Sequence, residues 1–263
     1  MVVTPPSDVV SALRAAGCVF AVEEARLLAE AARTSARLAE LVHRRVAGEP
    51  LEHLLGWAEF CGLRVAVSPG VFVPRRRTAL LVELALGLVR PGAVVVELCC
   101  GSAAVATVLA TRVPGLRVHA ADVDPVAVRC ARANLEPLDG HVYEGDLDAP
   151  LPGALLGRAD LVVANAPYVP TPAIALMPPE ARDHEPALAL DGGVDGLDVQ
   201  RRVAAAAPRW LAPGGHLLIE TSWPQAPQTV DLVGRAGLVG RVERSEELGA
   251  TVVVGESSRS NTW

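Results

Sequence analysis

The chain of 263 residues contains no lysine, so all 24 of its basic residues are arginine, and only 3% of its residues are aromatic. Acidic residues outnumber the arginines and leave a net charge of −6. Proteins that bind nucleic acid present basic surfaces to the phosphates, often with aromatic side chains that stack on bases. Neither feature is evident here, so direct binding of nucleic acid is not expected.

Long apolar runs and paired cysteines are also absent. No stretch reaches the roughly 18 uninterrupted apolar residues typical of a membrane span, and the start, MVVTPPSD, lacks the basic and apolar regions of a signal peptide. The five cysteines form no CxxC pair and no ligand-like cluster with histidine, which argues against structural zinc or another metal site. These absences predict a cytoplasmic protein with no membrane partner, whereas nothing in the sequence indicates its oligomeric state.

Three kinds of pattern follow one another along the chain. Apolar residues at helical spacing predict a helical bundle within residues 1–50, which either packs against the rest or holds a macromolecular substrate. Residues 51–74 predict a β-hairpin, and Val71–Val73 a further short strand. In residues 75–263 strand and helix patterns alternate from Gly92 onward, which predicts a doubly wound α/β domain with a largely parallel sheet.

Acidic residues stand at the ends of three successive strands of this predicted sheet: Glu97, Asp122 and Asp146. Ligands of such sheets bind outside the carboxyl ends of the strands, where Asp122 can accept hydrogen bonds from both hydroxyls of a ribose. Asp146 can receive the exocyclic amine of adenine, with Leu147 packed against the ring. Gly101 is the only glycine of the first turn, and the missing GxGxxG pattern disfavours a pyrophosphate. Glu97 suits an ammonium group, and the set outlines a site for S-adenosylmethionine.

A fourth strand end carries Asn165-Ala166-Pro167-Tyr168, here called the NAPY segment. Read alone, it is most simply a turn. It resembles the (Asp/Asn/Ser)-Pro-Pro-(Tyr/Phe/Trp) motif of methyltransferases that act on planar nitrogen. The flanking sequences also resemble the HemK/PrmC family of protein-(glutamine-N5) methyltransferases, in particular its actinobacterial-type paralogues; they read GEPLEHLLGWAEFCGLRV, GVFVPRR, DHEPALALDGGVDGLD and LAPGGHLLIETSWPQ.

The resemblance implies a Rossmann-like class I S-adenosylmethionine-dependent methyltransferase with a mixed seven-stranded sheet, a small N-terminal helical domain and a connecting β-hairpin. It implies residues 1–50 as a substrate-recognition domain, 51–74 as the hairpin linker and 75–263 as the catalytic domain. The cofactor is then S-adenosyl-L-methionine and its product S-adenosyl-L-homocysteine. The implied acceptor is the glutamine of the Gly-Gly-Gln loop in a peptide-chain release factor.

The strand-end pattern and the resemblance together predict the site residues. The predicted catalytic residues are Asn165, Ala166, Pro167 and Tyr168. The predicted cofactor-binding residues are Glu97, Cys99, Cys100, Gly101, Ser102, Ala103, Asp122, Val123, Asp146, Leu147 and Asn165, and the predicted substrate-binding residues are Asn165, Tyr168, Arg75 and Glu185. In this mechanism, the Asn165 side-chain oxygen and the Ala166 carbonyl accept the two N–H groups of the substrate amide, and Tyr168 stacks on its plane. Catalysis then comes from positioning.

The chain departs from the family pattern at several positions. Ala166 replaces the first Pro of the motif, Cys99 and Ala103 replace glycines, and Arg76-Arg77 stand where Pro-Glu is usual. Four other functions stay open at this point. They are N-methylation of another amide or of an amine in a small molecule, methylation of adenine N6 in nucleic acid, hydride transfer with a nicotinamide cofactor, and a binding module that has lost turnover.

Overall fold

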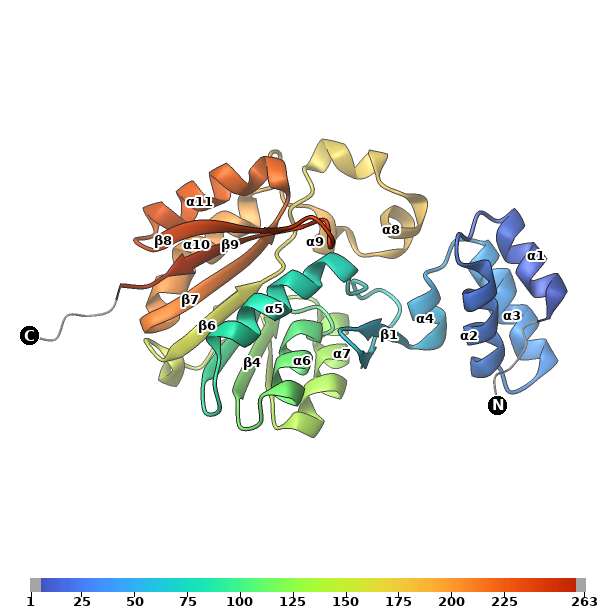
Figure 1. The fold of residues 1–263 in the computed structure, drawn as a ribbon, viewed down its shortest axis with the longest axis horizontal. Helices are drawn as coiled ribbons and strands as arrows, with labels where there is room; N and C mark the ends of the chain where they lie inside the picture. The colour runs from blue at the N-terminus through green and yellow to red at the C-terminus, as the bar shows by residue number, and fades with distance from the viewer. Residues whose placement is uncertain (1–5, 259–263) are drawn as a thin grey trace, which may run out of the picture.

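The structure is a computed structural model that describes residues 6–258. A group of N-terminal helices lies to one side of an α/β body whose central sheet has helices on both faces (Figure 1). None of the described helices combines the length and the apolar character needed to span a bilayer.

The N-terminal group consists of α1 (Ser7–Ala15), α2 (Ala21–Ala31) and α3 (Ser35–Val46). These helices bury one leucine each, at Leu13, Leu28 and Leu41, in a hydrophobic cluster that also includes Leu54 of the connecting segment. Thr34 begins α3, because its side-chain oxygen accepts a hydrogen bond from the backbone of Arg37. The small helical domain predicted from the sequence is therefore present.

The connecting segment contains a helix as well as the predicted hairpin. Helix α4 (Leu51–Leu55) comes first, followed by the antiparallel strands β1 (Trp57–Phe60) and β2 (Leu63–Ala66). The prediction of a further strand at Val71–Val73 is wrong. There the backbone does not pair with a neighbouring strand: Val71 N–H donates to the Ser68 carbonyl in a turn, Val73 N–H donates to the Glu185 side chain, and the Val71 carbonyl contacts a His53 ring nitrogen.

The central sheet has seven strands in the order β5-β4-β3-β6-β7-β9-β8. The first five in this order are parallel, and β9 lies antiparallel between β7 and β8. The predicted mixed, largely parallel sheet is confirmed. Its strands are β3 (Val94–Leu98), β4 (Arg117–Asp122), β5 (His141–Glu144), β6 (Ala159–Ala164), β7 (Leu211–Thr221), β8 (Val239–Ser245) and β9 (Ala250–Glu256).

Alternate residues of the buried strands point to opposite faces of the sheet. In β3, Val95 packs with one hydrophobic cluster, whereas Val94 and Val96 pack with another. The first cluster includes residues of α5 (Ala79–Leu88), α6 (Ala104–Arg112) and α7 (Pro125–Leu135), and the second those of α10 (Asp198–Trp210) and α11 (Ala226–Arg235).

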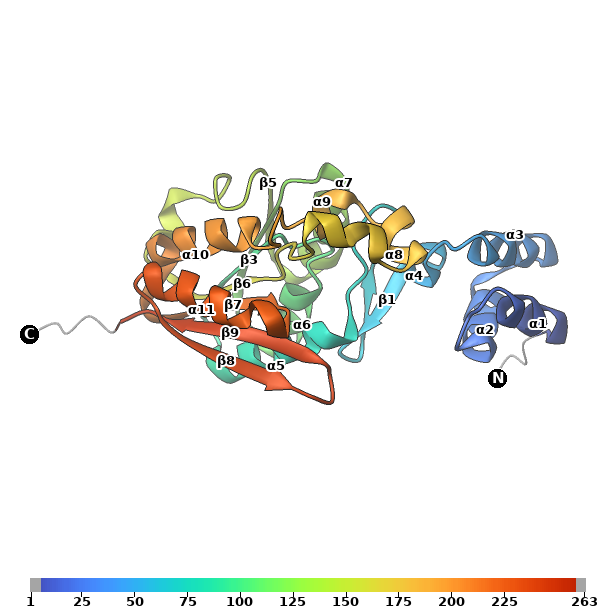
Figure 2. The ribbon, with the colours of Figure 1, turned by 90° about the horizontal axis from the view of Figure 1, so that it is seen from above.

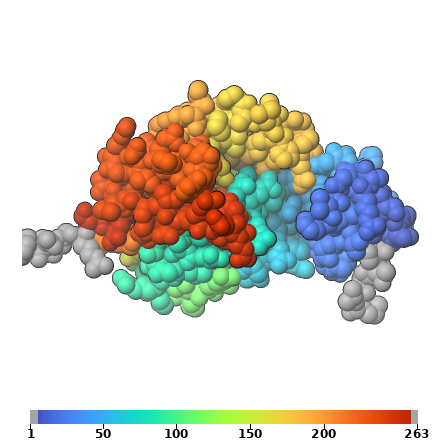
Figure 3. Space-filling view, turned by 45° about the horizontal axis from the view of Figure 1, so that its top comes forward, coloured from blue at the N-terminus to red at the C-terminus, as the bar shows by residue number. Residues whose placement is uncertain are grey.

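Two short helices, α8 (Pro179–His184) and α9 (Ala187–Leu190), belong to the long connection between β6 and α10. Two perpendicular views place α8 between the sheet and the N-terminal helices (Figures 1 and 2). In the space-filling view, the yellow surface of this connection lies between the orange C-terminal part and the blue N-terminal helices (Figure 3). Arg45 of α3 joins the two parts through an ion pair with Glu180 of α8 at 3.4 Å.

Candidate active site

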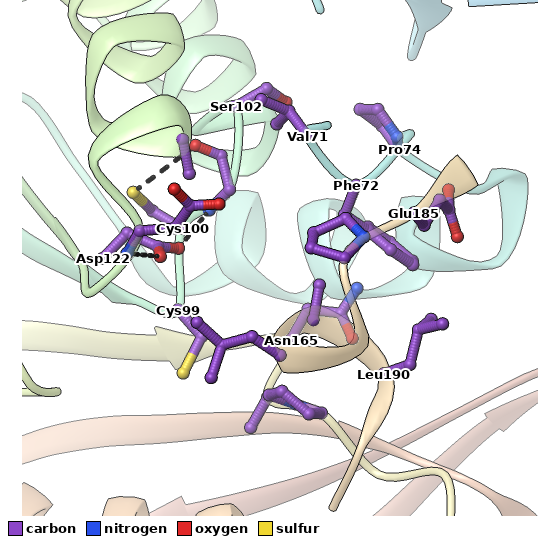
Figure 4. A pocket seen from close by; sticks show the side chains of 18 of the residues that line it. Val71, Phe72, Pro74, Cys99, Cys100, Ser102, Asp122, Asn165, Glu185 and Leu190 are labelled. Carbon is purple, nitrogen blue, oxygen red and sulfur yellow. Dashed lines mark hydrogen bonds between the residues drawn. The ribbon is translucent and has the colours of Figure 1, made fainter. Parts of the chain in front are cut away.

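A cavity of about 480 Å³ lies at the carboxyl ends of β3, β4 and β6 (Figure 4). The strand order reverses at β3, which is where sheets of this kind bind their ligands. The volume is within the range of small-molecule sites. Among the residues predicted from the sequence, the cavity wall includes Arg75, Glu97, Cys99, Cys100, Gly101, Ser102, Asp122, Val123, Asp146, Leu147, Asn165, Ala166, Pro167, Tyr168 and Glu185.

The turn after β3 has an alternating backbone conformation. Cys99, Gly101 and Ala103 all have φ values between 53° and 56°, in the left-handed region. Residues with a Cβ are disfavoured there by roughly 1–2 kcal/mol, so Cys99 and Ala103 keep a shape for which glycine would be unstrained. Ala103 itself is fully buried and directly precedes α6. It therefore lies in the core and is the one predicted cofactor residue outside the cavity wall.

The acids at the ends of β3 and β4 hold the adjacent backbone in place. Glu97, one residue before the end of β3, is buried and accepts a hydrogen bond from Ala106 N–H at 2.8 Å. Burial raises its pKa to about 8. Asp122 accepts hydrogen bonds from Gly101 N–H at 2.8 Å and from Asp124 N–H at 2.9 Å. Burial raises the pKa of Asp122 as well, so both carboxyl groups lie in a poorly hydrated part of the cavity.

The raised pKa of Glu97 predicts a pH dependence of stability. Between its ordinary pKa of 4.5 and the folded value of about 8, the folded protein keeps a proton that the unfolded chain loses. The contribution of Glu97 to the free energy of unfolding is therefore fully present below pH 4.5. It falls as the pH rises towards 8, by roughly 3–5 kcal/mol in total. We expect Glu97→Gln to remove this slope in chemical unfolding measured from pH 5 to pH 8.5. Parallel stability curves for the two proteins would contradict this assignment.

The third strand-end acid is already paired. Asp146 is exposed and forms an ion pair with Arg202 of α10 at 2.6 Å. Beside it, Leu147 is buried and has a φ of 50°, another strained position at the wall. Val123 is 45% exposed and contributes apolar surface above β4. One carboxylate oxygen of Asp146 thus remains for a ligand, and Arg202 adds a positive charge that sequence reasoning missed.

The NAPY segment leaves the sheet at the end of β6. The Asn165 side-chain N–H donates to the Thr78 hydroxyl at 3.4 Å, and no hydrogen bond among the described residues uses the Asn165 side-chain oxygen. Ala166 is only 1% exposed. The Tyr168 hydroxyl donates to Glu220 at 3.2 Å, and burial together with the Glu220 charge raises the pKa of Tyr168 to about 12. Tyr168 therefore stays a neutral phenol held at one end.

A glycine-containing loop supports this segment from behind. Gly196 has a φ of 77°, and a Cβ added to it would lie 2.4 Å from the Tyr168 carbonyl oxygen. The same carbonyl accepts a hydrogen bond from the Gln225 side chain at 3.0 Å. The sequence DGGVDG therefore serves to let the backbone of two loops approach closely.

Comparisons with known proteins bear on this site. Residues 62–176 match the family model described as "Methyltransferase small domain". The release factor glutamine methyltransferase of Geobacter sulfurreducens is 39% identical over 217 residues, which cover 82% of this chain and 75% of that protein. The chain belongs to the release factor glutamine methyltransferase family. Further members of this family are 37% to 44% identical.

A relative of another kind and a solved structure extend the comparison. The 4-amino-L-phenylalanine/4-methylamino-L-phenylalanine methyltransferase of Streptomyces pristinaespiralis is 40% identical over 68% of this chain and 63% of its own length. A methyltransferase from Pyrococcus furiosus of known structure superimposes with a TM-score of 0.57 at 16% identity, covering 86% of this chain and all of that one. The predicted class I methyltransferase fold is thus confirmed.

The three consecutive arginines, Arg75 to Arg77, have different surroundings. Arg75 forms an ion pair with buried Glu185 at 2.7 Å. Arg77 pairs with buried Glu220 at 3.2 Å, and its guanidinium lies 5.9 Å from the centre of the Tyr168 ring. The middle residue, Arg76, differs from both because its side chain is 75% exposed and pairs with the exposed Glu247 at 3.5 Å.

Two residues that sequence reasoning missed lie behind the NAPY segment. Thr78 is buried at the start of α5 and contacts Asn165. Glu220 stands near the end of β7 in the apolar run LLIET. An acid at the end of a buried strand is the signal that pointed to Glu97, so the same reasoning applied to β7 would have found Glu220.

Proposed function

We propose that the protein transfers a methyl group from S-adenosylmethionine to the side-chain amide nitrogen of a glutamine in the Gly-Gly-Gln loop of a peptide-chain release factor. The observation that carries this proposal is the orientation of Asn165. Its N–H is occupied by Thr78, so that its oxygen is available to an amide N–H in a cavity lined by acids at strand ends. The names of the relatives in the family support the choice of acceptor.

The residues around the turn after β3 fit the cofactor. A carboxylate has about four lone-pair positions, and backbone N–H groups occupy one on each oxygen of Asp122, which leaves two for ribose hydroxyls. Glu97 is buried without a counter-charge and therefore keeps its proton near neutral pH; an ammonium group beside it would supply a positive charge and favour its ionised form. Leu147 and Val123 offer apolar surface to a flat base. When bound, the cofactor supplies a methyl group on a positively charged sulfur.

The chain's own part in the reaction is to orient a weak nucleophile. The lone pair of an amide nitrogen is delocalised into the carbonyl, so binding must hold the nitrogen close to the methyl carbon and in line with it. The Asn165 side-chain oxygen and the Ala166 carbonyl accept the two N–H groups, and the Tyr168 ring covers the amide plane. Such positioning contributes up to roughly 7–11 kcal/mol in favourable geometry. Once it carries the methyl group, the amide nitrogen is strongly acidic and loses its extra proton to water, so no strong general base is required.

The other end of the cavity fits the acceptor. Phe72, Pro74, Glu185 and Leu190 lie on the far side of Asn165 from Cys99 and Asp122 (Figure 4). Glu185 uses one oxygen to accept hydrogen bonds from Val73 N–H and Arg75. Its other oxygen is buried without a partner, and an unpaired buried acceptor is costly. A backbone N–H of the bound loop would satisfy it.

This contact yields a prediction about Glu185. In Glu185→Gln an amide N–H takes the place of the unpaired oxygen. This position then donates a hydrogen bond instead of accepting one, and it repels a backbone N–H of the release-factor loop. We expect the KM for the release factor to rise about 10-fold or more, because hydrogen bonds to charged groups contribute roughly 1.5–3 kcal/mol, with an unchanged cofactor Kd. The control is Asp183→Asn, an exposed carboxylate of the same segment. An unaltered KM for Glu185→Gln would remove Glu185 from the acceptor site.

We also assign the domains as the sequence suggests: residues 1–50 for substrate recognition, 51–74 as linker and 75–263 for catalysis. Residues 1–5 and 259–263 lie outside the described part. The contact of Arg45 with Glu180, which lines the cavity, supports a link between the helices and the site. Val19 and Phe20 expose apolar surface on this helical group to a protein substrate.

A second candidate acceptor is the aromatic amine of a small amino acid. It is favoured by the 40% identical relative named for 4-amino-L-phenylalanine. It would bind at the same end of the cavity as the release-factor loop. There Phe72, Pro74 and Leu190 provide apolar walls for a ring, and the unpaired Glu185 oxygen suits an ammonium group.

One experiment separates these functions. The purified protein is incubated with methyl-labelled cofactor and a bacterial release factor, the same factor with the loop glutamine changed to alanine, or 4-amino-L-phenylalanine. Label on the glutamine, found by mass spectrometry and absent from the alanine variant, is the expected result. Label only on the amino acid would favour the second candidate, and label on none would contradict both.

A further inference from the structure

Two buried side-chain atoms of the described chain lack a hydrogen-bond partner, and both are carboxylate oxygens near the NAPY segment: one of Glu185 and one of Glu220. The Glu185 side chain is only 1% exposed but belongs to the cavity wall. Glu220 is equally buried, with its side chain 1% exposed, and does not belong to the cavity wall. A buried acid that no ligand touches requires another explanation, because burying a charge is costly unless neighbouring groups use it.

The neighbours of the Glu220 carboxylate come from two separate parts of the chain, Arg77-Thr78 and Tyr168. One of its oxygens accepts hydrogen bonds from the Tyr168 hydroxyl and from the Arg77 guanidinium, both at 3.2 Å. Burial raises the pKa of Glu220, and the Thr78 hydroxyl and Arg77 counteract this. Thr78 therefore faces the carboxylate, although its hydroxyl does not complete a hydrogen bond of standard geometry to the unpaired oxygen.

Thr78 also contacts Asn165, and a hydroxyl has only one hydrogen. If that hydrogen points to the Glu220 carboxylate, the lone pairs of the Thr78 oxygen face Asn165. The Asn165 amide then presents its N–H to Thr78, as it does at 3.4 Å, and its oxygen stays available to a substrate amide. The opposite amide orientation would set two acceptors against each other.

We propose that Glu220 is a positioning residue for methyl transfer: through Thr78 it determines which way the Asn165 amide faces, and by direct contact it holds Tyr168. The proposal rests on the proposed function and adds a residue that does not touch the substrate. Arg77 supplies a counter-charge at 3.2 Å, which favours the form of the Glu220 carboxylate that only accepts hydrogen bonds. A neutral residue in place of Glu220 would let Thr78 turn its hydrogen towards Asn165.

The activity test compares variants that keep or remove single links. Thr78→Val and Glu220→Gln should each lower kcat about 10- to 100-fold, the range for one hydrogen bond that involves a charge, with the cofactor Kd unchanged. Thr78→Ser keeps the hydroxyl and should recover most of kcat. The double variant should be no worse than the more impaired single variant, because both changes break one chain of contacts. The matched control is Thr111→Val, at an exposed threonine of α6. Wild-type kcat in Thr78→Val, or losses that multiply in the double variant, would overturn the proposal.

A second measurement does not need an acceptor. The side-chain amide protons of Asn165, assigned in NMR spectra by their loss in Asn165→Ala, should shift and exchange faster in Thr78→Val and in Glu220→Gln but not in Thr78→Ser. Asn165 amide signals that stay unchanged in both Thr78→Val and Glu220→Gln would overturn the positioning role, whichever molecule accepts the methyl group. A wild-type protein that methylates no glutamine, but whose amide signals respond as expected, would contradict the proposed function alone.

Discussion

Replacing Asn165 by alanine should lower kcat for glutamine methylation about 100- to 1000-fold, the loss typical when one preorganised polar group at a reacting centre is removed. The variant loses the oxygen that accepts a substrate N–H, and with it the orientation of the nitrogen. The side-chain contact with Thr78 is made at 3.4 Å and adds little to folding. The thermal midpoint should therefore change by only a few degrees. Steady-state kinetics gives kcat, and scanning calorimetry with the cofactor present gives the thermal midpoint.

The interpretation of this variant depends on cofactor binding. We expect its cofactor Kd to stay within about threefold of wild type, because Asp122 and Glu97 lie on other strands and remain in place. Asn165→Asp keeps the side-chain oxygen but loses the N–H that donates to Thr78. Its kcat should lie between those of the wild type and Asn165→Ala. Full activity in Asn165→Ala would show that the NAPY segment is only a turn.

Replacing Asp122 by alanine should weaken cofactor binding about 100-fold or more. Two hydrogen bonds from ribose hydroxyls to a carboxylate are lost, each contributing roughly 1.5–3 kcal/mol. The Gly101 and Asp124 N–H groups also lose their acceptor, so the turn after β3 becomes less well held. Isothermal titration with S-adenosylmethionine and S-adenosylhomocysteine measures the effect, which should be similar for both because they share the ribose.

Graded variants distinguish a binding contact from general damage. Asp122→Asn keeps one acceptor oxygen and should lose less affinity than alanine does. Asp231→Ala, at an exposed aspartate of α11, removes a carboxylate far from the cavity wall and should bind normally. An Asp122→Ala protein with wild-type affinity would place the ribose elsewhere in the cavity.

Periodicity was sufficient for the fold class because buried strands and amphipathic helices have distinct patterns. The parallel strands β3, β4 and β6 could be read as apolar runs, and parallel strands end at one edge of the sheet. Because of that geometry, sequence pattern alone predicts Glu97, Asp122 and Asn165 in a single site, and all three line the cavity. The prediction for Val71–Val73 was wrong because its apolar pattern is that of a strand, whereas its hydrogen bonds go to the nearby Ser68 carbonyl and to the distant side chains of His53 and Glu185.

By itself, the sequence determined the α/β architecture, the position of the cavity and most of its wall, since these follow from local pattern and from the common direction of parallel strands. Only the tertiary structure decided how the polar groups are shared. Arg75 and Arg77 are neighbours in sequence but pair with Glu185 and Glu220, which come from different parts of the chain. Hydrogen bonds between distant segments depend on packing and leave no local pattern, so the orientation of Asn165 became visible only in the folded chain.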